Sequence, residues 1–353
     1  MTIQQLLQYT IQHGCSDLHL VVGSPPIVRK DGSLVAVAGE EKLTDARVEQ
    51  LVAGVMSTEQ KQILLVNKEI DFSFSYGDEA RFRVNAYFQR NSQAASFRWI
   101  SAKIPMIDSL GLPKIAHDFA ILKQGFVLVT GPTGHGKSTT LAAILEEINQ
   151  TRPVHVVTIE DPIEYVYTSA KGIVSQREVH NDTHSWEIAL RSVLREDPDV
   201  VLIGEMRDFE TIAAALTIAE TGHLVFATLH TNSAAQTMDR IVDVFPENQQ
   251  PQVRAQLSAN LEAVLSQRLI PRIGGGRVLA YEIMVGTSAV RTAIREGRTH
   301  MLDNIIMTSA EYGMVPLEGM LARLVREGVI TLEVAQAYAI RPADVARYVK
   351  GGE

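Results

Sequence analysis

Residues 126–139 have the sequence Phe-Val-Leu-Val-Thr-Gly-Pro-Thr-Gly-His-Gly-Lys-Ser-Thr, an apolar run followed by a glycine-rich turn. The turn fits the pattern G-x-x-x-x-G-K-[ST], which is typical of the P-loop that holds nucleotide phosphates. Glycine lets the backbone curve closely enough for its N–H groups to point at phosphate oxygens. The motif predicts a nucleotide-binding segment formed by Gly131, Pro132, Thr133, Gly134, His135, Gly136, Lys137, Ser138 and Thr139.

Within this segment, we expect Lys137 to bind the β- and γ-phosphates of ATP and the Ser138 hydroxyl to hold Mg²⁺. The flanking sequence supports the motif. Residues 126–130 have the composition of a buried strand. The residues after the loop have the i, i+3, i+4, i+7 spacing of one helix face, at Leu141, Ile144, Leu145 and Ile148.

Four apolar runs, at residues 126–130, 154–159, 200–203 and 224–229, alternate with segments of helical character. Nearly continuous apolar strands between helices are typical of a parallel sheet covered on both faces. We therefore predict an α/β fold around the P-loop. Ligands of such sheets bind beyond the carboxyl ends of the strands, where acidic residues follow the second and third runs.

The second run ends in Glu160, Asp161 and Glu164, three carboxylates within five residues. Beside a phosphate site such a group suits metal handling, and Glu164 is expected to orient or deprotonate the attacking water. The alternative is a solvated acidic loop. The third run ends at Glu205, the layout of a Walker B strand, so we expect Glu205 to reach Mg²⁺ together with Ser138.

Histidines flank the fourth run, with His223 before it and His230 after it. An imidazole near the γ-phosphate can sense hydrolysis, so both are catalytic candidates. They lie at opposite ends of the expected strand and need not share a role. His135 lies near the phosphates by its place in the loop, and we expect its backbone rather than its ring to matter.

The N-terminal segment predicts a short amphipathic helix, with Ile3, Leu6, Leu7 and Ile11 on one side. Residues 15–100 alternate short β-like runs with turns, around a helical stretch at residues 44–67, so residues 1–100 predict an α+β domain. Arg81 and Arg83 are alternate residues of one run and share a face, and Arg98 lies on a later run. Phosphoryl transfer needs cations near the γ-phosphate, and these arginines are candidates. A solvated arginine face is the alternative.

The chain divides by composition into four parts. After the N-terminal domain, residues 101–123 contain Pro105, Gly111 and Pro113, show little periodicity and predict a linker. Residues 124–285 carry the alternating strands and helices of the expected nucleotide-binding core. Residues 286–353 have mostly helical character.

Composition limits the remaining possibilities. The chain of 353 residues has a net charge of −8, which does not favour general nucleic-acid binding. Its single cysteine, Cys15, excludes an intrachain disulfide and a multi-cysteine zinc site and is typical of a reducing compartment. The sequence contains neither a run of about 18 apolar residues nor a signal peptide, so we expect a cytoplasmic protein.

Taken together, the motifs resemble those of the secretion ATPases and, within them, the ATPases of type IV pilus retraction, which power twitching motility. Six stretches carry the resemblance, which covers almost the whole chain. They are the opening motifs within residues 16–32, residues 81–85 (Arg-Phe-Arg-Val-Asn), the P-loop at 131–139, the acidic segment 158–164, residues 194–208 around the Walker B strand, and the histidine segment 219–232.

The resemblance implies a PAS-like N-terminal domain joined to a RecA-like ATPase domain, assembled as a homohexamer. ATP would bind between domains, with the N-terminal domain of a neighbouring subunit contributing. By position, Arg81, Arg83 and Arg98 would be the cations that reach the nucleotide. Glu164 would be the catalytic glutamate and Glu205 the acid on the metal side. His223 and His230 would couple the nucleotide state to motion, and Arg277 would touch the ring interface.

The implied function is a motor at the inner membrane that acts on a pilus platform protein, with an accessory retraction ATPase as a possible partner. Four alternatives remain: an assembly ATPase of pilus extension or type II secretion, the accessory paralogue, a scaffold that binds ATP without turnover, and a DNA-translocating motor. The assembly ATPases typically carry further N-terminal domains and a four-cysteine zinc insertion, which this sequence lacks.

The sequence departs from the family pattern at two places. His135 replaces the serine that the family usually carries in the P-loop, and we expect activity to survive this change. In residues 289–296, a segment linked to retraction, Thr292 and Ala293 replace asparagine and leucine. This second departure concerns the efficiency of retraction more than hydrolysis.

Overall fold

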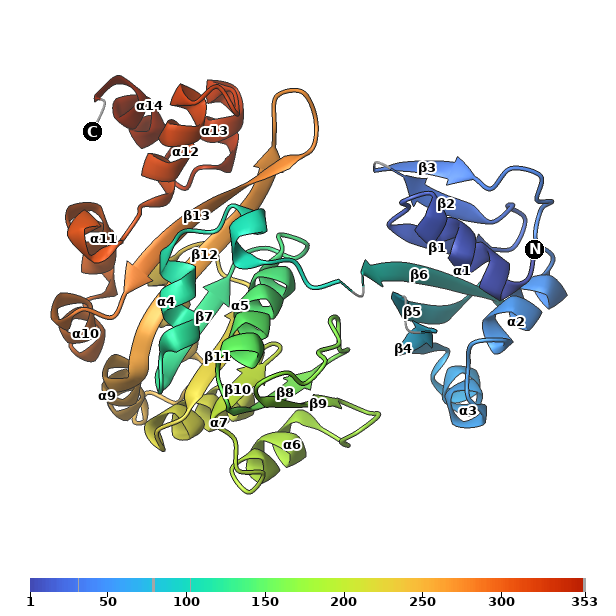
Figure 1. Ribbon diagram of the computed structural model, residues 1–353, viewed down its shortest axis with the longest axis horizontal. Helices are drawn as coiled ribbons and strands as arrows, with labels where there is room; N and C mark the ends of the chain where they lie inside the picture. The colour runs from blue at the N-terminus through green and yellow to red at the C-terminus, as the bar shows by residue number, and fades with distance from the viewer. Residues whose placement is uncertain (31, 78–79, 102, 352–353) are drawn as a thin grey trace. The chain divides into compact units, whose positions relative to one another are not determined.

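The computed structural model describes the chain except residues 31, 78–79, 102 and 352–353, so the parts of the predicted linker and C-terminal region at 102 and 352–353 lie outside the described residues. The chain forms two compact units (Figure 1). The first contains Met1–Lys103 and Pro162–Val166, and the second contains Ile104–Asp161 and Tyr167–Glu353.

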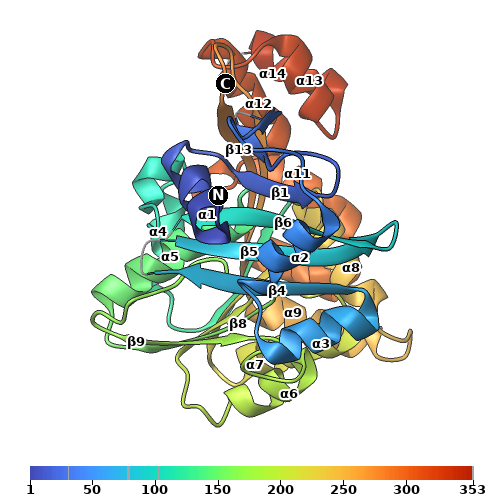
Figure 2. The same cartoon turned by 90° about the vertical axis from the view of Figure 1, so that its right-hand side faces the viewer.

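The described residues of the first unit form a six-stranded antiparallel sheet with the order β3-β2-β1-β6-β5-β4, part of which faces the viewer in Figure 2. The strands are β1 (Asp17–Val21), β2 (Ile27–Lys30), β3 (Ser33–Ala36), β4 (Glu69–Tyr76), β5 (Ala80–Gln89) and β6 (Ser92–Ser101). The helices are α1 (Ile3–Gln12), α2 (Asp45–Ala53) and α3 (Thr58–Asn67). The single helical stretch predicted at residues 44–67 is two helices, because α2 ends at Gly54 and Ser57 caps the start of α3.

Period-2 alternation in β5 separates the two faces of this sheet. Phe82 and Val84 are fully buried and pack with Leu6 and Leu51 of the covering helices. Arg81 and Arg83 therefore point to the opposite face. The unit has its own hydrophobic core, which includes the buried Cys15 as a small packed side chain.

The second unit contains a seven-stranded sheet in the described residues, with the order β13-β12-β7-β11-β10-β8-β9. Its strands are β7 (Gly125–Thr130), β8 (His155–Glu160), β9 (Ile173–Glu178), β10 (Val200–Ile203), β11 (Leu224–Leu229), β12 (Leu261–Pro271) and β13 (Arg277–Val285). All neighbouring pairs are parallel except β12 and β13. The four predicted strands are confirmed, whereas β9, β12 and β13 were not predicted.

Helices cover both faces of this sheet. Alternate residues of β7 face opposite cores: Phe126 and Leu128 belong to one, and Val127 and Val129 to the other. The first core is completed by α6 (Trp186–Val193), α7 (Phe209–Glu220), α8 (Ala234–Asp243), α9 (Gln250–Asn260), α10 (Ser288–Arg295) and α11 (Leu302–Thr308). The second is completed by α4 (Ile115–Ile121), α5 (Lys137–Thr151), α12 (Leu317–Arg326), α13 (Leu332–Tyr338) and α14 (Pro342–Gly351). The arrangement confirms the predicted α/β fold with an α+β N-terminal unit.

The segment predicted as a linker needs correction. Residues 104–123 belong to the second unit and contain a 3₁₀ turn, Ile107–Leu110, and helix α4. Ala116, Phe119 and Ala120 of α4 are buried against Ile144 and Ile148 of α5. The seven-residue helix is too short to give a clear period in the sequence, and its burial depends on α5, which follows the next strand.

A carboxylate is buried where β13 meets the start of α8. Glu282 is 2% exposed, and its Oε1 accepts a hydrogen bond of 2.7 Å from the backbone N–H of Ala234. Burial raises the pKa of Glu282 to about 7; the Ala234 N–H opposes this shift, and Asp303 and Glu318 add to it. The positive end of α8 thus holds a group that ionises near neutral pH.

This burial predicts a pH-dependent stability. Between the ordinary pKa of 4.5 and about 7, folded Glu282 keeps a proton that the unfolded chain has lost, so the free energy of unfolding falls as pH rises. Glutamine accepts the same N–H bond without ionising. We expect the free energy of unfolding of Glu282→Gln to exceed that of wild type by about 2 kcal/mol at about pH 8. At about pH 5 the two free energies should differ little. Urea unfolding at matched protein concentration measures this.

The matched control is Glu187→Gln on α6, an exposed carboxylate paired with Arg191, which should change stability by the same small amount at both pH values. An equal stability difference between Glu282→Gln and wild type at the two pH values would show that ionisation of Glu282 is not the cause.

Candidate functional site

The P-loop connects β7 to α5, as predicted. Gly131 has φ +139°, and a Cβ on it would lie 2.3 Å from the backbone oxygen of Gln267 on β12. Only glycine fits this close approach. Gly136 has φ +84° and is the N-cap of α5, which begins at Lys137. The N–H groups and the dipole of the first turn make this helix end a site for anions.

Lys137 lies within the loop. Its Nζ donates hydrogen bonds of 2.8 Å and 3.1 Å to the backbone oxygens of Gly131 and Pro132. The same Nζ lies 3.2 Å from Nδ1 of His230. The side chain is therefore held at the inner surface of the loop, where a phosphate would meet it, and it connects the loop to the end of β11.

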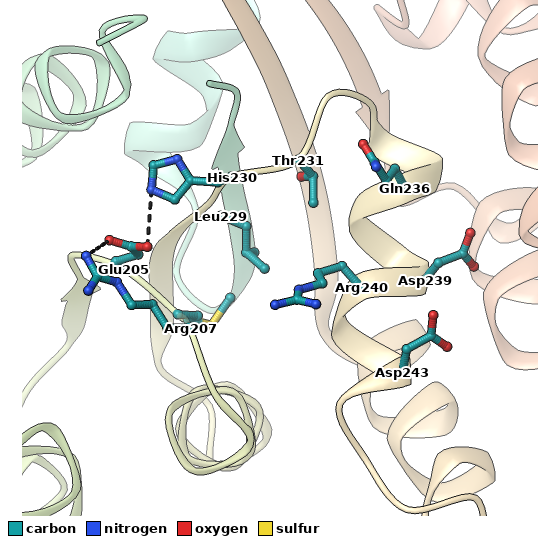
Figure 3. A pocket seen from close by; sticks show the side chains of 10 residues that line it. Glu205, Arg207, Leu229, His230, Thr231, Gln236, Asp239, Arg240 and Asp243 are labelled. Carbon is teal, nitrogen blue, oxygen red and sulfur yellow. Dashed lines mark hydrogen bonds and ion pairs between the residues drawn. The ribbon is translucent and has the colours of Figure 1, made fainter. Parts of the chain in front are cut away.

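The acid that follows β10 lies beside the same histidine (Figure 3). Oε1 of Glu205 is 3.1 Å from Nε2 of His230, and Oε2 is 2.7 Å from Nη2 of Arg207. Burial would raise the pKa of Glu205, but the hydrogen bond and charge of Arg207, together with His230, outweigh burial and leave the pKa below its ordinary value. Glu205 is therefore an ionised carboxylate, the form that binds a metal ion.

The contacts of His230 are compatible with one tautomer. Nδ1 faces the ammonium of Lys137, which can only donate, and Nε2 faces the carboxylate of Glu205, which can only accept. A neutral ring with its proton on Nε2 satisfies both, as assigned from these partners. Thr133 Oγ1 lies 3.3 Å from Nδ1. The structure thus brings the predicted residues Lys137, Glu205 and His230 together.

The acidic segment after β8 divides between the two units. Glu160 is buried and accepts hydrogen bonds from Thr158 at 2.7 Å and Gln176 at 3.3 Å. Asp161 is exposed, and its charge is one of the smaller influences that raise the pKa of Arg207, after the hydrogen bond to Glu205. Glu164 is half-buried in the segment that groups with the first unit, and no hydrogen bond or ion pair joins it to another described residue.

His223 lies at the opposite end of its strand from His230, as the sequence analysis expected. Leu224 pairs with Gly125 and Leu229 with Thr130, so His223 lies at the amino end of β11 and the P-loop follows the other end of β7. The ring of His223 lies 2.9 Å from Thr221 Oγ1 and 3.1 Å from the Ile218 oxygen. It stabilises the turn between α7 and β11.

The three predicted arginines share the polar face of the first unit. Arg83 lies directly opposite Arg98, and Arg98 lies opposite Asp17. The Arg98 Nε is 3.0 Å from Asp17 Oδ1, and the Arg83 Nε is 3.9 Å from Asp71 Oδ1. Arg81 donates to the Ser73 hydroxyl. The arginines form one row of cations across neighbouring strands.

The sequence analysis expected the backbone of His135 to matter rather than its ring, and the structure shows that the ring also makes a hydrogen bond. Its Nδ1 accepts a hydrogen bond of 3.0 Å from the backbone N–H of Leu269. Burial lowers the pKa of His135, and the nearby cations Arg277, Lys137 and Arg268 lower it further, so the ring is neutral.

Residues on β12 and β13 that the motifs did not identify also contact the loop. Gln267 Nε2 donates to the His135 oxygen at 2.7 Å, and Arg277 Nη1 lies 3.4 Å from the Gly134 oxygen. Both positions are more than 130 residues from the loop in sequence, and β12 was not predicted. The only earlier signal was the family resemblance, which placed Arg277 at a ring interface.

A cavity of about 620 Å³ opens beside the Glu205–His230 pair rather than over the P-loop. One side is formed by the segment after β10 and the end of β11, and the other by the exposed face of α8 (Figure 3). Its charged and polar lining includes Glu205, Arg207, His230, Gln236, Asp239, Arg240 and Asp243.

The parallel sheet, the P-loop and the ionised acid after the Walker B strand define a P-loop ATPase. The chain belongs to the type II/IV secretion system protein family, whose model matches residues 2–327. Among the described residues, none of the helices is long and apolar enough to cross a membrane, and no group of three or more histidine, cysteine, aspartate or glutamate residues is arranged to hold a metal ion.

Two relatives are similar over nearly their whole length. The type IV pilus retraction ATPase PilT of Pseudomonas aeruginosa is 48% identical over 342 residues, 97% of this chain and 99% of PilT. The type IV pilus ATPase PilU of the same organism is 39% identical over 353 residues, 100% of this chain and 92% of PilU. A crystal structure of the pilus retraction motor PilT with bound ADP matches with a TM-score of 0.91 at 46% identity, covering 98% of this chain and 99% of that one.

Proposed function

We propose that the chain is the ATPase motor of type IV pilus retraction and works as a homohexamer. The observation that carries this proposal is the 48% identity to the retraction ATPase PilT over nearly the full length of both chains. The contacts among the P-loop, Glu205 and His230 support ATP turnover as the energy source. We also propose that residues 1–100 act as the PAS-like domain, residues 124–285 as the RecA-like ATPase core, and residues 286–353 as a helical C-terminal region.

ATP binding follows from the loop geometry. The first-turn N–H groups of α5 and the loop amides bind the phosphates, with Thr139 at the start of the helix. Lys137 exchanges its contact with His230 for the β- and γ-phosphates, which releases Nδ1 of His230. The imidazole thereby reports whether the loop is occupied. It remains joined to Glu205 through Nε2.

The residues present fit a Mg²⁺ ion. The Ser138 hydroxyl at the first turn of α5 and the ionised Glu205 would hold the ion through hard oxygen donors, the ligand type that Mg²⁺ prefers. When bound, Mg²⁺ would neutralise charge on the β- and γ-phosphates.

In hydrolysis, Glu164 is the residue that acts on the attacking water. Its carboxylate has no hydrogen-bond partner among the described residues and can accept a proton from water or orient it. Glu160 and Asp161 belong to the segment that carries Glu164, and we assign them to positioning it. Arg81, Arg83 and Arg98 of a neighbouring copy then offset the charge that develops on the γ-phosphate. The shared face of these arginines supports this role.

The ring would work on a pilus platform protein at the cytoplasmic face of the inner membrane, without a nucleic-acid partner. The 39% identity to PilU favours the accessory retraction ATPase as the second candidate function. An extension or type II secretion ATPase, a scaffold without turnover and a DNA motor are less favoured. DNA-stimulated ATP hydrolysis would support the DNA motor, and an absence of hydrolysis would support the scaffold.

Deletion of the gene separates retraction from extension. We expect the cells to carry an excess of surface pili that no longer retract, because assembly continues without its opposing motor. Electron microscopy and imaging of labelled pili measure both properties, and the wild-type gene supplied in trans is the control. Bald cells would instead indicate an extension ATPase. Normal pilus number with retraction that fails only under load would indicate the accessory paralogue.

A further inference from the structure

The side chain of His135 connects the P-loop to the neighbouring strand β12. β7 pairs with β12 only up to Thr130 and Ser266, because the chain then leaves β7 to form the loop. Beyond this point the edge of β12 has no strand partner on that side. The backbone N–H of Leu269 would be left unpaired there, and Nδ1 of His135 accepts it at 3.0 Å.

Two further contacts hold the same part of the loop. Gln267, which is 1% exposed, donates through Nε2 to the His135 oxygen at 2.7 Å. Arg277 on β13 lies 3.4 Å from the Gly134 oxygen. Two successive carbonyl groups of the loop are therefore directed outward, toward β12 and β13.

These outward carbonyls determine where the amides point. In a trans peptide the C=O and N–H groups point in opposite directions. Directing the Gly134 and His135 oxygens outward therefore directs the N–H groups of His135 and Gly136 inward, toward the phosphate position. Amides fixed before binding lose less conformational entropy when a phosphate arrives.

We propose that His135 is a positioning residue whose Nδ1 fixes the P-loop to β12 and thereby prepares the His135 and Gly136 amides for phosphate. The proposal depends on nucleotide binding alone and not on the action on pili. It rests on the imidazole of His135, whose Nδ1 reaches the backbone N–H of Leu269 on β12.

The test compares side chains with and without an acceptor at the δ1 position. His135→Asn places an oxygen at that position, His135→Gln places its oxygen one bond further out, and His135→Leu offers no acceptor. Binding of ADP with a fluorescent ribose label to the full-length protein gives Kd, and steady-state hydrolysis gives KM and kcat for ATP.

We expect His135→Leu to raise Kd and KM about tenfold, the effect of one hydrogen bond, while kcat stays close to wild type. His135→Asn should restore both constants nearly to wild type. The control, His184→Leu on an exposed loop, should change neither. A structural role alone would lower thermal stability and kcat together and would not be rescued by asparagine.

Wild-type affinity in His135→Leu, or equal weakening in His135→Leu and His135→Asn, would overturn the proposal. If His135→Leu loses the native melting transition, the decisive comparison is between His135→Asn and His135→Gln. The proposal predicts that His135→Asn binds ADP about tenfold more tightly than His135→Gln, and equal affinities of the two variants would contradict it.

Discussion

Replacing Glu164 by glutamine is expected to lower kcat for ATP hydrolysis by about a hundred- to ten-thousandfold, the range for loss of a general base. Glutamine keeps the size of the side chain but cannot accept the proton of the attacking water. Because the P-loop and Glu205 remain intact, binding of ADP or a non-cleavable ATP analogue should be unchanged. Phosphate release by the purified protein and a separate binding measurement test the two parts.

Glu41→Gln is the matched control, since Glu41 is an exposed carboxylate elsewhere in the first unit. It should hydrolyse ATP like wild type. If Glu164→Gln kept wild-type turnover, Glu164 would lose its proposed role, and another acid, such as Asp161, would have to position the water.

Replacing Lys137 by alanine is expected to weaken nucleotide binding by about tenfold to a hundredfold, because a charge-assisted bond to phosphate contributes about 1.5–3 kcal/mol. Turnover should fall below detection, since Lys137 also offsets charge on the γ-phosphate in the transition state. The change should remove the Lys137–His230 contact as well. Equilibrium binding of labelled ADP and phosphate release give the two effects.

Lys171→Ala serves as the control, because Lys171 is an exposed lysine in the same unit and its backbone hydrogen bond does not depend on its side chain. It should bind and hydrolyse like wild type. Tight nucleotide binding by Lys137→Ala would mean that the loop is not the phosphate site.

Local patterns predicted the central part of the fold. The run 126–130, the glycines and the periodic face of α5 are contiguous in sequence, so a strand, loop and helix follow from neighbouring residues alone. The edge of the sheet was missed for physical reasons. The first four residues of β9 alternate between exposed and half-buried. β12 begins directly after α9, contains the polar residues Ser266, Gln267 and Arg268, and shifts register against β7 between Leu261 and Ala263. Neither has the continuous apolar run that marks a central strand.

The site likewise contains residues that local patterns predicted and residues that they did not. Glu205 and His230 were predicted because each ends a strand, and parallel strands bring their carboxyl ends to one edge. His223 and His230 were predicted at opposite ends of one strand, and this is confirmed, because His223 precedes β11 and His230 follows it. The contacts of Gln267 and Leu269 with His135 join positions over 130 residues apart, and no local pattern predicts them.

The most direct test of the account is retraction of labelled pili in living cells whose chromosomal copy encodes Glu164→Gln, at protein levels matched to wild type. The account predicts that pili extend but do not retract, and that a wild-type copy restores retraction. Retraction at wild-type speed and frequency in the Glu164→Gln cells would show that ATP hydrolysis by this chain does not drive the movement.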